Sequence, residues 1–188
     1  MLTTMELRWF YRGTIPEEIK QWFGADSLLG HLTPPEERED LYLYAAGCDY
    51  LGIKFRQNKL EVKWRQEELG VLRADKVEGK AEKWVKWSCK DPTPESFLVA
   101  SVTEKGEWVS VKKVRSQRLY ETCAVEIAQV NIRDNDWWSL GFETLGEDEH
   151  LMDNLKAVAS QVFQSYHGSL LQAQDSFAYP KLLALVVE

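Results

Sequence analysis

The segment from Leu51 to Arg65 contains two short runs in which charged and apolar residues alternate, on either side of Gln57-Asn58. Alternation with a period of two is typical of a β-strand that has one polar and one apolar face. A two-residue connection between two such runs is typical of a hairpin. The segment therefore predicts a β-hairpin, and it is the best-defined unit of the chain.

The charges of this hairpin also predict its register. If Arg56 pairs with Lys59, then Lys54 lies opposite Glu61 and each strand keeps its charged residues on one side. A register shifted by one residue would mix polar and apolar side chains, so the pairing is well specified. The polar side carries Gly52, Lys54, Arg56, Lys59, Glu61, Lys63 and Arg65, and the apolar side carries Leu51, Ile53, Phe55, Leu60, Val62 and Trp64.

Similar patterns predict the rest of the secondary structure. Further strands are expected at Glu6–Arg12, Arg38–Tyr44, Val77–Trp87 and Glu107–Tyr120, with a second hairpin over Cys123–Leu145. About eight strands are expected against two clear helices. This balance predicts an α+β fold, dominated by an antiparallel sheet or barrel.

The first helix is expected after a capping box at Thr14–Glu17, with Ile19, Trp22 and Phe23 on one side and Gly24 at its end. The second is expected over Glu147–Phe163, where the apolar period becomes helical. The remaining segments are predicted as a loop at Asp26–Glu37, a short helix or loop near Thr93–Ala100, and a last strand or packed extended segment at Phe177–Val187.

Composition limits the classes of function. The 188 residues fit one domain, and the net charge of −7 argues against general nucleic-acid or anionic-membrane binding, although an acidic total can hide a local basic cavity. Three cysteines, far apart and without CxxC spacing, are typical of reduced thiols. Neither a signal peptide nor a membrane-spanning apolar run is visible, so a cytoplasmic location is expected.

The second hairpin predicts an unusual pair of carboxylates. Centring its turn on Asp134-Asn135 places Glu126 directly opposite Glu143. Like charges at directly opposed positions destabilise a sheet unless a cation bridges them, one is protonated, or both face open water. A solvated sheet face with splayed glutamates is the plainer alternative, and it applies equally to the charged face of the first hairpin.

Repetition of this pattern favours a functional site. Basic residues occur strand after strand on one side: Arg8 shares a face with Glu6, Arg38 with Asp40 and Tyr42, and Lys113 with Arg115. At least two strands also place a glutamate on this side. If the sheet closes on itself, these sides line a polar interior. Basic side chains around a few carboxylates suit a polyanion held with a divalent metal such as Mg²⁺ or Mn²⁺.

Other chemistries find little support in the sequence. The three histidines are isolated, and there is no nucleophile elbow, Walker A motif or dinucleotide fingerprint. Tryptophans are more often core residues than ligand platforms. Trp137-Trp138, beside a turn, is the pair to examine as a surface for a protein partner.

The motifs together resemble the CYTH domain, also called the triphosphate tunnel metalloenzyme superfamily. The resemblance spans most of the chain in order and lies in short motifs: Glu6-Leu-Arg8, Asp40-Leu-Tyr42, Gly52-Ile-Lys54-Phe-Arg56, Leu60-Glu-Val-Lys63-Trp-Arg65, Val114-Arg115, Ala124-Val-Glu126 and Ser139-Leu-Gly-Phe-Glu143. It implies one domain over residues 1–188, folded as an eight-stranded antiparallel β-tunnel with flanking helices. It also implies a triphosphate or another phosphorylated small molecule, or inorganic polyphosphate, as ligand, bound with one or two divalent metals.

The resemblance also suggests roles for residues. Glu126 and Glu143 are similar by position to metal-binding glutamates of the family, and Glu6 completes the predicted metal set. The predicted substrate-binding residues are Arg8, Arg38, Lys54, Arg56, Lys63, Arg65, Lys113 and Arg115. The first strand departs from the family's Glu-x-Glu-x-Lys pattern, because Glu6, Arg8 and Phe10 hold those places, so a carboxylate has become a cation and a lysine an aromatic ring.

Three hypotheses follow. The first is metal-dependent hydrolysis of a triphosphate-containing molecule, with a metal-positioned water attacking a phosphoryl group held by the basic residues. The second is a binding module on the same fold, in which Arg8 supplies a fixed positive charge in place of metal charge. The third is a protein-interaction scaffold that uses the Trp137-Trp138 turn. A requirement for divalent metal separates the first hypothesis from the second.

Overall fold

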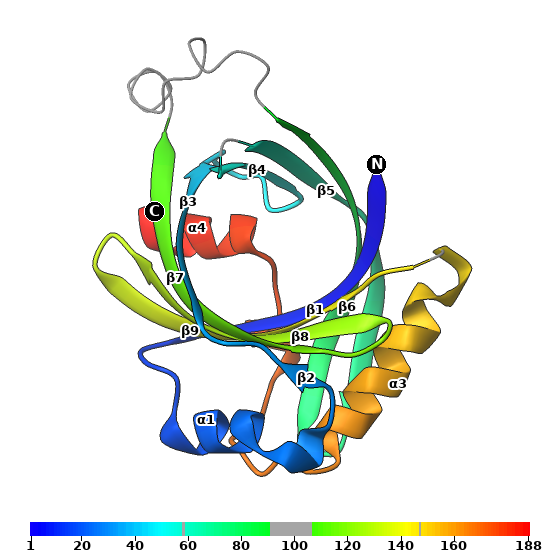
Figure 1. Ribbon diagram of the computed structural model, residues 1–188. Helices are drawn as coiled ribbons and strands as arrows, with labels where there is room; N and C mark the ends of the chain where they lie inside the picture. Colours follow the sequence, from blue (N-terminus) through cyan, green and yellow to red (C-terminus); the bar gives the residue numbers. More distant parts are fainter. Residues whose placement is uncertain (58, 91–106, 147) are drawn as a thin grey trace.

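Long antiparallel strands close into a ring in the part of the chain that the structure describes, residues 1–57, 59–90, 107–146 and 148–188 of a computed structural model (Figure 1). Around the ring the order is β7-β3-β4-β5-β6-β1-β9-β8, and β8 pairs with β7 to complete it. The strands are β1 Leu2–Arg12, β3 Glu36–Leu43, β4 Leu51–Arg56, β5 Lys59–Ala74, β6 Val77–Lys90, β7 Trp108–Leu119, β8 Cys123–Ile132 and β9 Asn135–Thr144. The predicted eight-stranded antiparallel tunnel is confirmed within these residues.

The first hairpin has the predicted register. Arg56 pairs with Lys59 and Lys54 with Glu61, so the charged side chains of β4 and β5 share one face. β5 then continues past the predicted end of the hairpin to Ala74, with bulges that keep it paired to β6. Of the two predicted turn residues, Gln57 has a φ of 48°, and Asn58 lies outside the described residues.

The second hairpin turns one residue earlier than predicted, which moves the pairing partner of each residue by two positions. Its turn is Arg133-Asp134, both in the left-handed region with φ of 50° and 62°, and Ile132 pairs with Asn135. Two central residues with positive φ give the turn whose twist matches the strands of a hairpin. Asp134-Asn135 was the wrong centre because several adjacent Asp and Asn residues tolerate this conformation almost equally.

This shift corrects the pairing of the two glutamates. Glu126 lies opposite Gly141, and Glu143 lies opposite Ala124, so the predicted Glu126–Glu143 pair does not form. The predicted partner of each glutamate is wrong by two residues, and side chains along a strand alternate with a period of two. Both glutamates therefore still face the interior of the ring, as expected.

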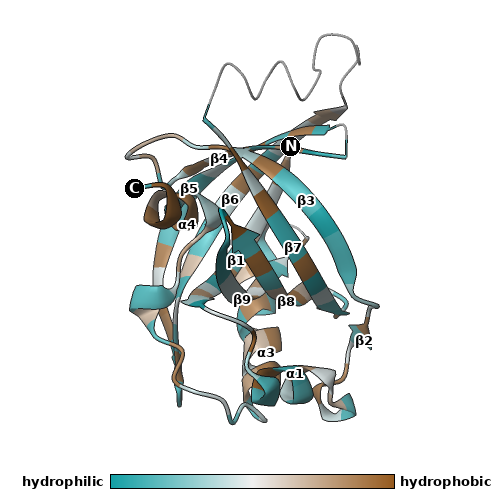
Figure 2. Cartoon of the chain, turned by 90° about the vertical axis from the view of Figure 1, so that its left-hand side faces the viewer, coloured by the Kyte–Doolittle hydropathy of each residue, from teal (hydrophilic) through white to brown (hydrophobic). Residues whose placement is uncertain are grey.

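Two helices cover the outside of the ring, below β1, β9 and β8 in both views (Figures 1 and 2). Helix α1 spans Glu17–Gly24 and begins after Pro16 without a side-chain cap, so the predicted capping box does not form. Helix α3 spans Leu151–Phe163 and buries the predicted apolar stripe. It begins later than expected, after a 3-10 turn at Asp148–His150; Glu147 lies outside the described residues, as does Thr93–Ala100.

The C-terminal segment is a helix rather than the predicted strand or extended segment. Helix α4 spans Tyr179–Val187, with a proline in its first turn, where the missing N–H costs no hydrogen bond. Its apolar composition was the reason for expecting a strand. In a short apolar run, the spacing of apolar residues does not distinguish a helix from a strand. The helix lies across one end of the ring (Figures 1 and 2). No described helix is long and apolar enough to cross a membrane.

The segment predicted as a loop, Asp26–Glu37, contains short regular pieces. They are a 3-10 turn at Asp26–Leu28, a two-residue strand β2 at His31–Leu32 that pairs with β7, and the start of β3. A further 3-10 turn occupies Ala173–Asp175.

The strands separate two apolar cores. One lies outside the ring, where residues such as Leu7, Trp9 and Phe142 pack under α1 and α3. The other lies inside the ring at one end, where Phe10, Val111 and Val130 pack against Leu182 and Leu183 of α4. Trp138 belongs to the outer core and Trp137 to the inner one, at 4% and 5% exposed, so the expected partner surface at this pair is wrong.

Arg118 connects the outer face of β7 to the segment after α1. Arg118 is 3% exposed, and its guanidinium donates to the carbonyl oxygens of Phe23 and Ala25 at 2.8 Å and of Leu29 at 2.6 Å. Phe23 lies in the last turn of α1, where carbonyl groups lack a partner within the helix, and Ala25 and Leu29 flank the 3-10 turn that follows. One arginine therefore supplies three of the hydrogen bonds that hold α1 and its following turn against the barrel, and the Tyr120 hydroxyl donates another to the carbonyl oxygen of Leu28 at 2.7 Å.

Replacing Arg118 with methionine is expected to lower the free energy of unfolding by about 2 kcal/mol, because buried carbonyl groups lose charge-assisted hydrogen bonds. Urea unfolding followed by circular dichroism measures the change. Arg73→Met, at an exposed ion pair with Glu78, serves as the control and should change stability by less than about 0.5 kcal/mol. Equal effects of the two substitutions would contradict this account of Arg118.

Candidate anion-binding site

A polar cavity occupies the half of the ring that α4 does not fill. Its position follows from strand alternation: on β1, Leu7 and Trp9 enter the outer core while Glu6 and Arg8 point inward. The cavity is about 810 Å³, solvent at its open side included. The charged side chains that line it, called the tunnel site, are Glu6, Arg8, Arg38, Lys54, Arg56, Glu61, Lys63, Lys86, Lys113, Arg115, Glu126 and Glu143.

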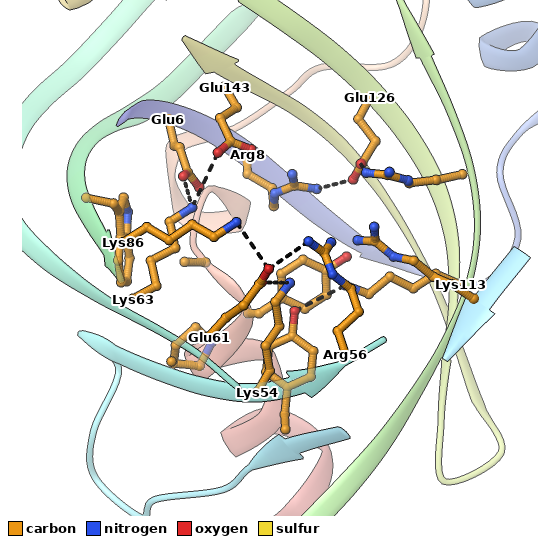
Figure 3. A pocket seen from close by; sticks show the side chains of 18 residues that line it. Glu6, Arg8, Lys54, Arg56, Glu61, Lys63, Lys86, Lys113, Glu126 and Glu143 are labelled. Atoms are coloured by element: carbon orange, nitrogen blue, oxygen red, sulfur yellow. Dashed lines mark hydrogen bonds and ion pairs between the residues drawn. The ribbon is translucent and has the colours of Figure 1, made fainter. Parts of the chain in front are cut away.

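Arg8, on β1, lies at the base of the site (its floor), where its side chain extends across β9 toward β8. Its Nη1 donates to Glu126 at 3.0 Å (Figure 3) and to Ser139 at 3.2 Å. The guanidinium lies over Gly141, where an added Cβ would be 2.6 Å from Arg8 Cζ. Only glycine leaves this space for the arginine without a shift.

Glu126 receives a second arginine on its other oxygen, with Arg115 Nη1 at 3.1 Å from Oε2. Burial opposes ionisation of this carboxyl group, but the charges of Arg8, Lys113 and Arg115 outweigh it and lower its pKa to about 2. Glu126 is therefore a permanent anion at neutral pH, and its charge is shared by two arginines.

Lys63 lies between two carboxylates of neighbouring strands. Glu6 on β1 is directly opposite Glu143 on β9. The Nζ of Lys63 contacts Glu6 and is 3.9 Å from Glu143 (Figure 3). The charge of Lys63 lowers the pKa of Glu143, whereas burial lowers the pKa of Lys63. A cation of the protein thus stands where two adjacent carboxylates would otherwise repel.

A third cluster is centred on Glu61, which β5 projects between its neighbours β4 and β6. Arg56 Nη2 is 2.8 Å from Glu61 Oε1, and Lys86 Nζ is 3.4 Å from the same oxygen. Lys54 Nζ is 3.2 Å from Oε2. Figure 3 shows this carboxylate surrounded by the three cations.

A fourth cluster is centred on Asp40, which is fully buried on β3. Lys113 Nζ is 3.2 Å from Asp40 Oδ2, and Arg38 and Lys54 approach the same oxygen at 3.6 Å. Lys113 Nζ also donates a hydrogen bond to the hydroxyl oxygen of Tyr42, at 3.2 Å. Burial opposes ionisation of Asp40, but its cations prevail and lower its pKa.

The structure brings together most of the predicted site residues and leaves one outside. All three predicted carboxylates, and seven of the eight predicted basic residues, line the tunnel site. Arg65 is not among the described lining residues; its guanidinium pairs with Glu82 at 2.9 Å and with Asp49 and Glu68 at 3.2 and 3.1 Å. Strand alternation placed Arg65 on the correct face, and its position along β5 takes it away from the cavity.

Other lining residues were missed. Lys86 and Trp84 lie two residues apart on a strand that was predicted, so the alternation that selected other basic residues could have selected Lys86. Tyr179, at the start of α4, had no such signal, because its position depends on how the last helix packs. Its ring lies 3.6 Å from Lys113 Nζ and 5.4 Å from Arg8 Cζ.

Phe10, the aromatic residue at the lysine position of the family pattern, lies at the apolar end of the ring's interior. Phe10, 2% exposed, stacks on Phe177 at 5.4 Å and contacts the edge of Tyr179 at 4.9 Å between ring centroids. Where the resemblance leads one to expect a lysine, the chain uses a ring to anchor the segment that carries α4.

The tunnel site has an excess of positive charge. Among its described lining residues there are eight Arg or Lys side chains and four glutamates, a difference of four, and Asp40 behind them reduces the excess to three. The whole chain carries a net charge of −7. Positive charge is therefore concentrated inside the ring, where low-dielectric walls strengthen its attraction for anions.

The three predicted metal ligands do not fit a resident divalent ion. Arg8 and Arg115 hold Glu126, and Lys63 contacts Glu6 beside Glu143. Divalent metals such as Mg²⁺ need several free oxygen ligands around one point. Among the residues that the structure describes, no group of three acidic, histidine or cysteine side chains is arranged to hold a metal ion.

The fold occurs in solved structures of other proteins. The PH1012 protein of Pyrococcus horikoshii matches with a TM-score of 0.55 and 18% identity over 94% of this chain and 98% of that one. The Pct1 RNA triphosphatase of Schizosaccharomyces pombe matches at 0.52 and 9%, over 86% and 82% of the two chains. A chain of the S. pombe Mediator head module matches at 0.52 and 11%, over 87% and 94%.

These likenesses confirm the fold that the sequence motifs led us to expect, that of the CYTH or triphosphate tunnel proteins. At such low identities they concern the fold alone. Neither a family model nor a curated protein matches the sequence.

Proposed function

We propose that this protein binds a phosphorylated anion, such as a triphosphate or the end of a polyphosphate, inside the tunnel through fixed cations of its own chain. The observation that carries the proposal is the convergence of eight cationic side chains on one cavity of an acidic protein. Arginine and lysine are the side chains that neutralise phosphate oxygens, and the forked guanidinium can contact two oxygens at once.

The proposal includes binding without a divalent metal. Arg8 provides a permanent positive charge on the floor of the site, and its contacts with Glu126 and Ser139 fix its position. A metal ion would have to compete with this arginine and with Lys63 for the same carboxylates. The positive charges of these side chains thus neutralise the ligand in place of a metal ion.

Metal-dependent hydrolysis is the second candidate, and the fold that the chain shares with an RNA triphosphatase favours it. The two candidates differ in what they require. Hydrolysis by the predicted route needs Mg²⁺ or Mn²⁺ at the glutamates, whereas binding by fixed cations is indifferent to a chelator.

Isothermal titration calorimetry with tripolyphosphate is expected to show binding in EDTA. A twofold or smaller change in affinity is expected at low free Mg²⁺, once magnesium binding by the ligand itself is accounted for. Lys113→Met should weaken binding roughly tenfold, the cost of one charge-assisted contact. Lys112→Met, one residue away on the outer face, is the matched control and should bind as the unaltered protein does.

Two results would contradict the proposal. One is the absence of tripolyphosphate binding in EDTA, followed by binding when Mg²⁺ or Mn²⁺ is added. The other is metal-dependent release of orthophosphate that disappears in Glu126→Gln, Glu143→Gln, which would establish the hydrolase candidate instead.

A further inference from the structure

Glu61 differs from the other carboxylates of the tunnel site in how its oxygens are used. It is 3% exposed, although it projects among three cations that line an open cavity. Oε1 accepts a hydrogen bond from Arg56, while Oε2 is buried without a hydrogen bond to any described residue, its closest cation being Lys54 at 3.2 Å. The three cations therefore surround an anion that satisfies only part of their hydrogen-bonding capacity.

We propose that Glu61 is a built-in counter-anion, which occupies the position of one phosphoryl group and is displaced from Lys54, Arg56 and Lys86 when the ligand binds. As far as the class of ligand is concerned, this inference rests on the proposed function. It assigns to Glu61 the role of a specificity-determining residue, because a ligand must bind the three cations better than the carboxylate does.

The charges around Glu61 explain why such a counter-anion is needed. Lys54, Arg56 and Lys86 come from β4 and β6 and point to one place (Figure 3). Three cations held together without an anion would repel one another, and the cost is high away from water. Burial opposes ionisation of Glu61, but these cations lower its pKa, so that the carboxylate remains charged.

The chemistry of the two anions favours exchange. A phosphoryl group offers three charged oxygen atoms to the same donors, whereas the carboxylate offers two and leaves one without a hydrogen bond. Asp40 makes a useful contrast. Asp40 also has one oxygen without a hydrogen bond to any described residue, and its other oxygen is approached by Lys113, Arg38 and Lys54. It differs from Glu61 in position, because its short side chain is fully buried behind the lining and supports the cations from outside the cavity.

The test uses orthophosphate, a probe with a single phosphoryl group, so that the subsite of Glu61 is examined by itself. Titration of the full chain, at constant ionic strength and in EDTA, is expected to show an affinity at least tenfold higher in Glu61→Gln than in the unaltered protein, since the amide keeps the shape but removes the competing charge. Glu78→Gln removes one charge at an exposed pair with Arg73 and should leave the affinity unchanged.

An unchanged or lower affinity of Glu61→Gln for orthophosphate would overturn the inference and make Glu61 a residue that positions the cations. A failure of tripolyphosphate to bind the unaltered protein would instead refute the proposed function, whatever the orthophosphate comparison gives. If Glu61→Gln alone does not fold, Lys86→Met is compared with Glu61→Gln, Lys86→Met. The double variant should bind orthophosphate more tightly, and equal affinities would overturn the inference.

Discussion

Arg8→Met is expected to weaken tripolyphosphate binding roughly 100-fold, because the substitution removes a guanidinium that is already in place for the ligand. It is also expected to lower the free energy of unfolding by about 3 kcal/mol, because Glu126 loses one of its two buried cations. Calorimetric titration measures the first effect and urea unfolding the second. Both follow from one residue, since Arg8 faces the cavity and supports its floor.

Two further variants separate these roles. Arg8→Lys keeps the charge but not the fork, so it should recover much of the stability and less of the affinity. Arg12→Met, on the same strand but outside the tunnel site, removes a cation that lies 4.8 Å from the Trp137 ring and should leave affinity unchanged. Unchanged tripolyphosphate binding by a folded Arg8→Met protein would exclude Arg8 from the site of binding.

The stability of the protein is expected to fall in acid, and Glu126 is expected to account for a large share of the fall. Its pKa is lowered from 4.5 to about 2 in the folded protein. A carboxyl group of this kind contributes stability above its unfolded pKa and loses it as the pH falls through the folded value. The contribution is about 3 kcal/mol at neutral pH, and about 2 kcal/mol of it is lost by pH 3.

Glu126→Gln cannot titrate, so it provides the comparison. The variant should be less stable than the unaltered protein at pH 7, and the gap between them should narrow by about 2 kcal/mol at pH 3. Urea unfolding at a series of pH values measures the gap, with Glu78→Gln as the control at an exposed pair. A gap that stays constant from pH 7 to pH 3 would mean that Glu126 is not held as an anion by Arg8 and Arg115.

The sequence predicts the ring of strands well, because the signal that it contains is local. In the first hairpin, charged and apolar residues alternate without interruption, and only one register keeps Lys54 opposite Glu61 with the faces unmixed. In the second hairpin, adjacent Asp and Asn residues suit more than one turn, so the centre was placed wrongly. The inward faces were nevertheless correct, because the pairing partner of each residue shifted by two positions, an even number.

What the sequence could not predict depends on contacts between distant segments. Arg65 and Lys63 have the same alternation and differ only in their distance from the cavity along β5. Tyr179 enters the site because α4 crosses the end of the ring, and the burial of Trp137 and Trp138 depends on the two cores. The likeness of motifs gave the expected fold. Whether a carboxylate is free to bind a metal ion depends on its cation partners, and no single motif contains those partners.

The apolar filling of one end of the ring has a consequence for polymeric ligands. Because Phe10, Val111 and Val130 pack against Leu182 and Leu183 there, a chain of phosphates cannot thread through the barrel from end to end. If such a chain binds as proposed, only one of its ends would enter the cavity, and it would leave along the same path. The number of protein molecules bound would therefore depend on the number of polyphosphate ends and not on chain length. At equal total phosphate, a short polyphosphate would saturate more molecules of this protein than a long one.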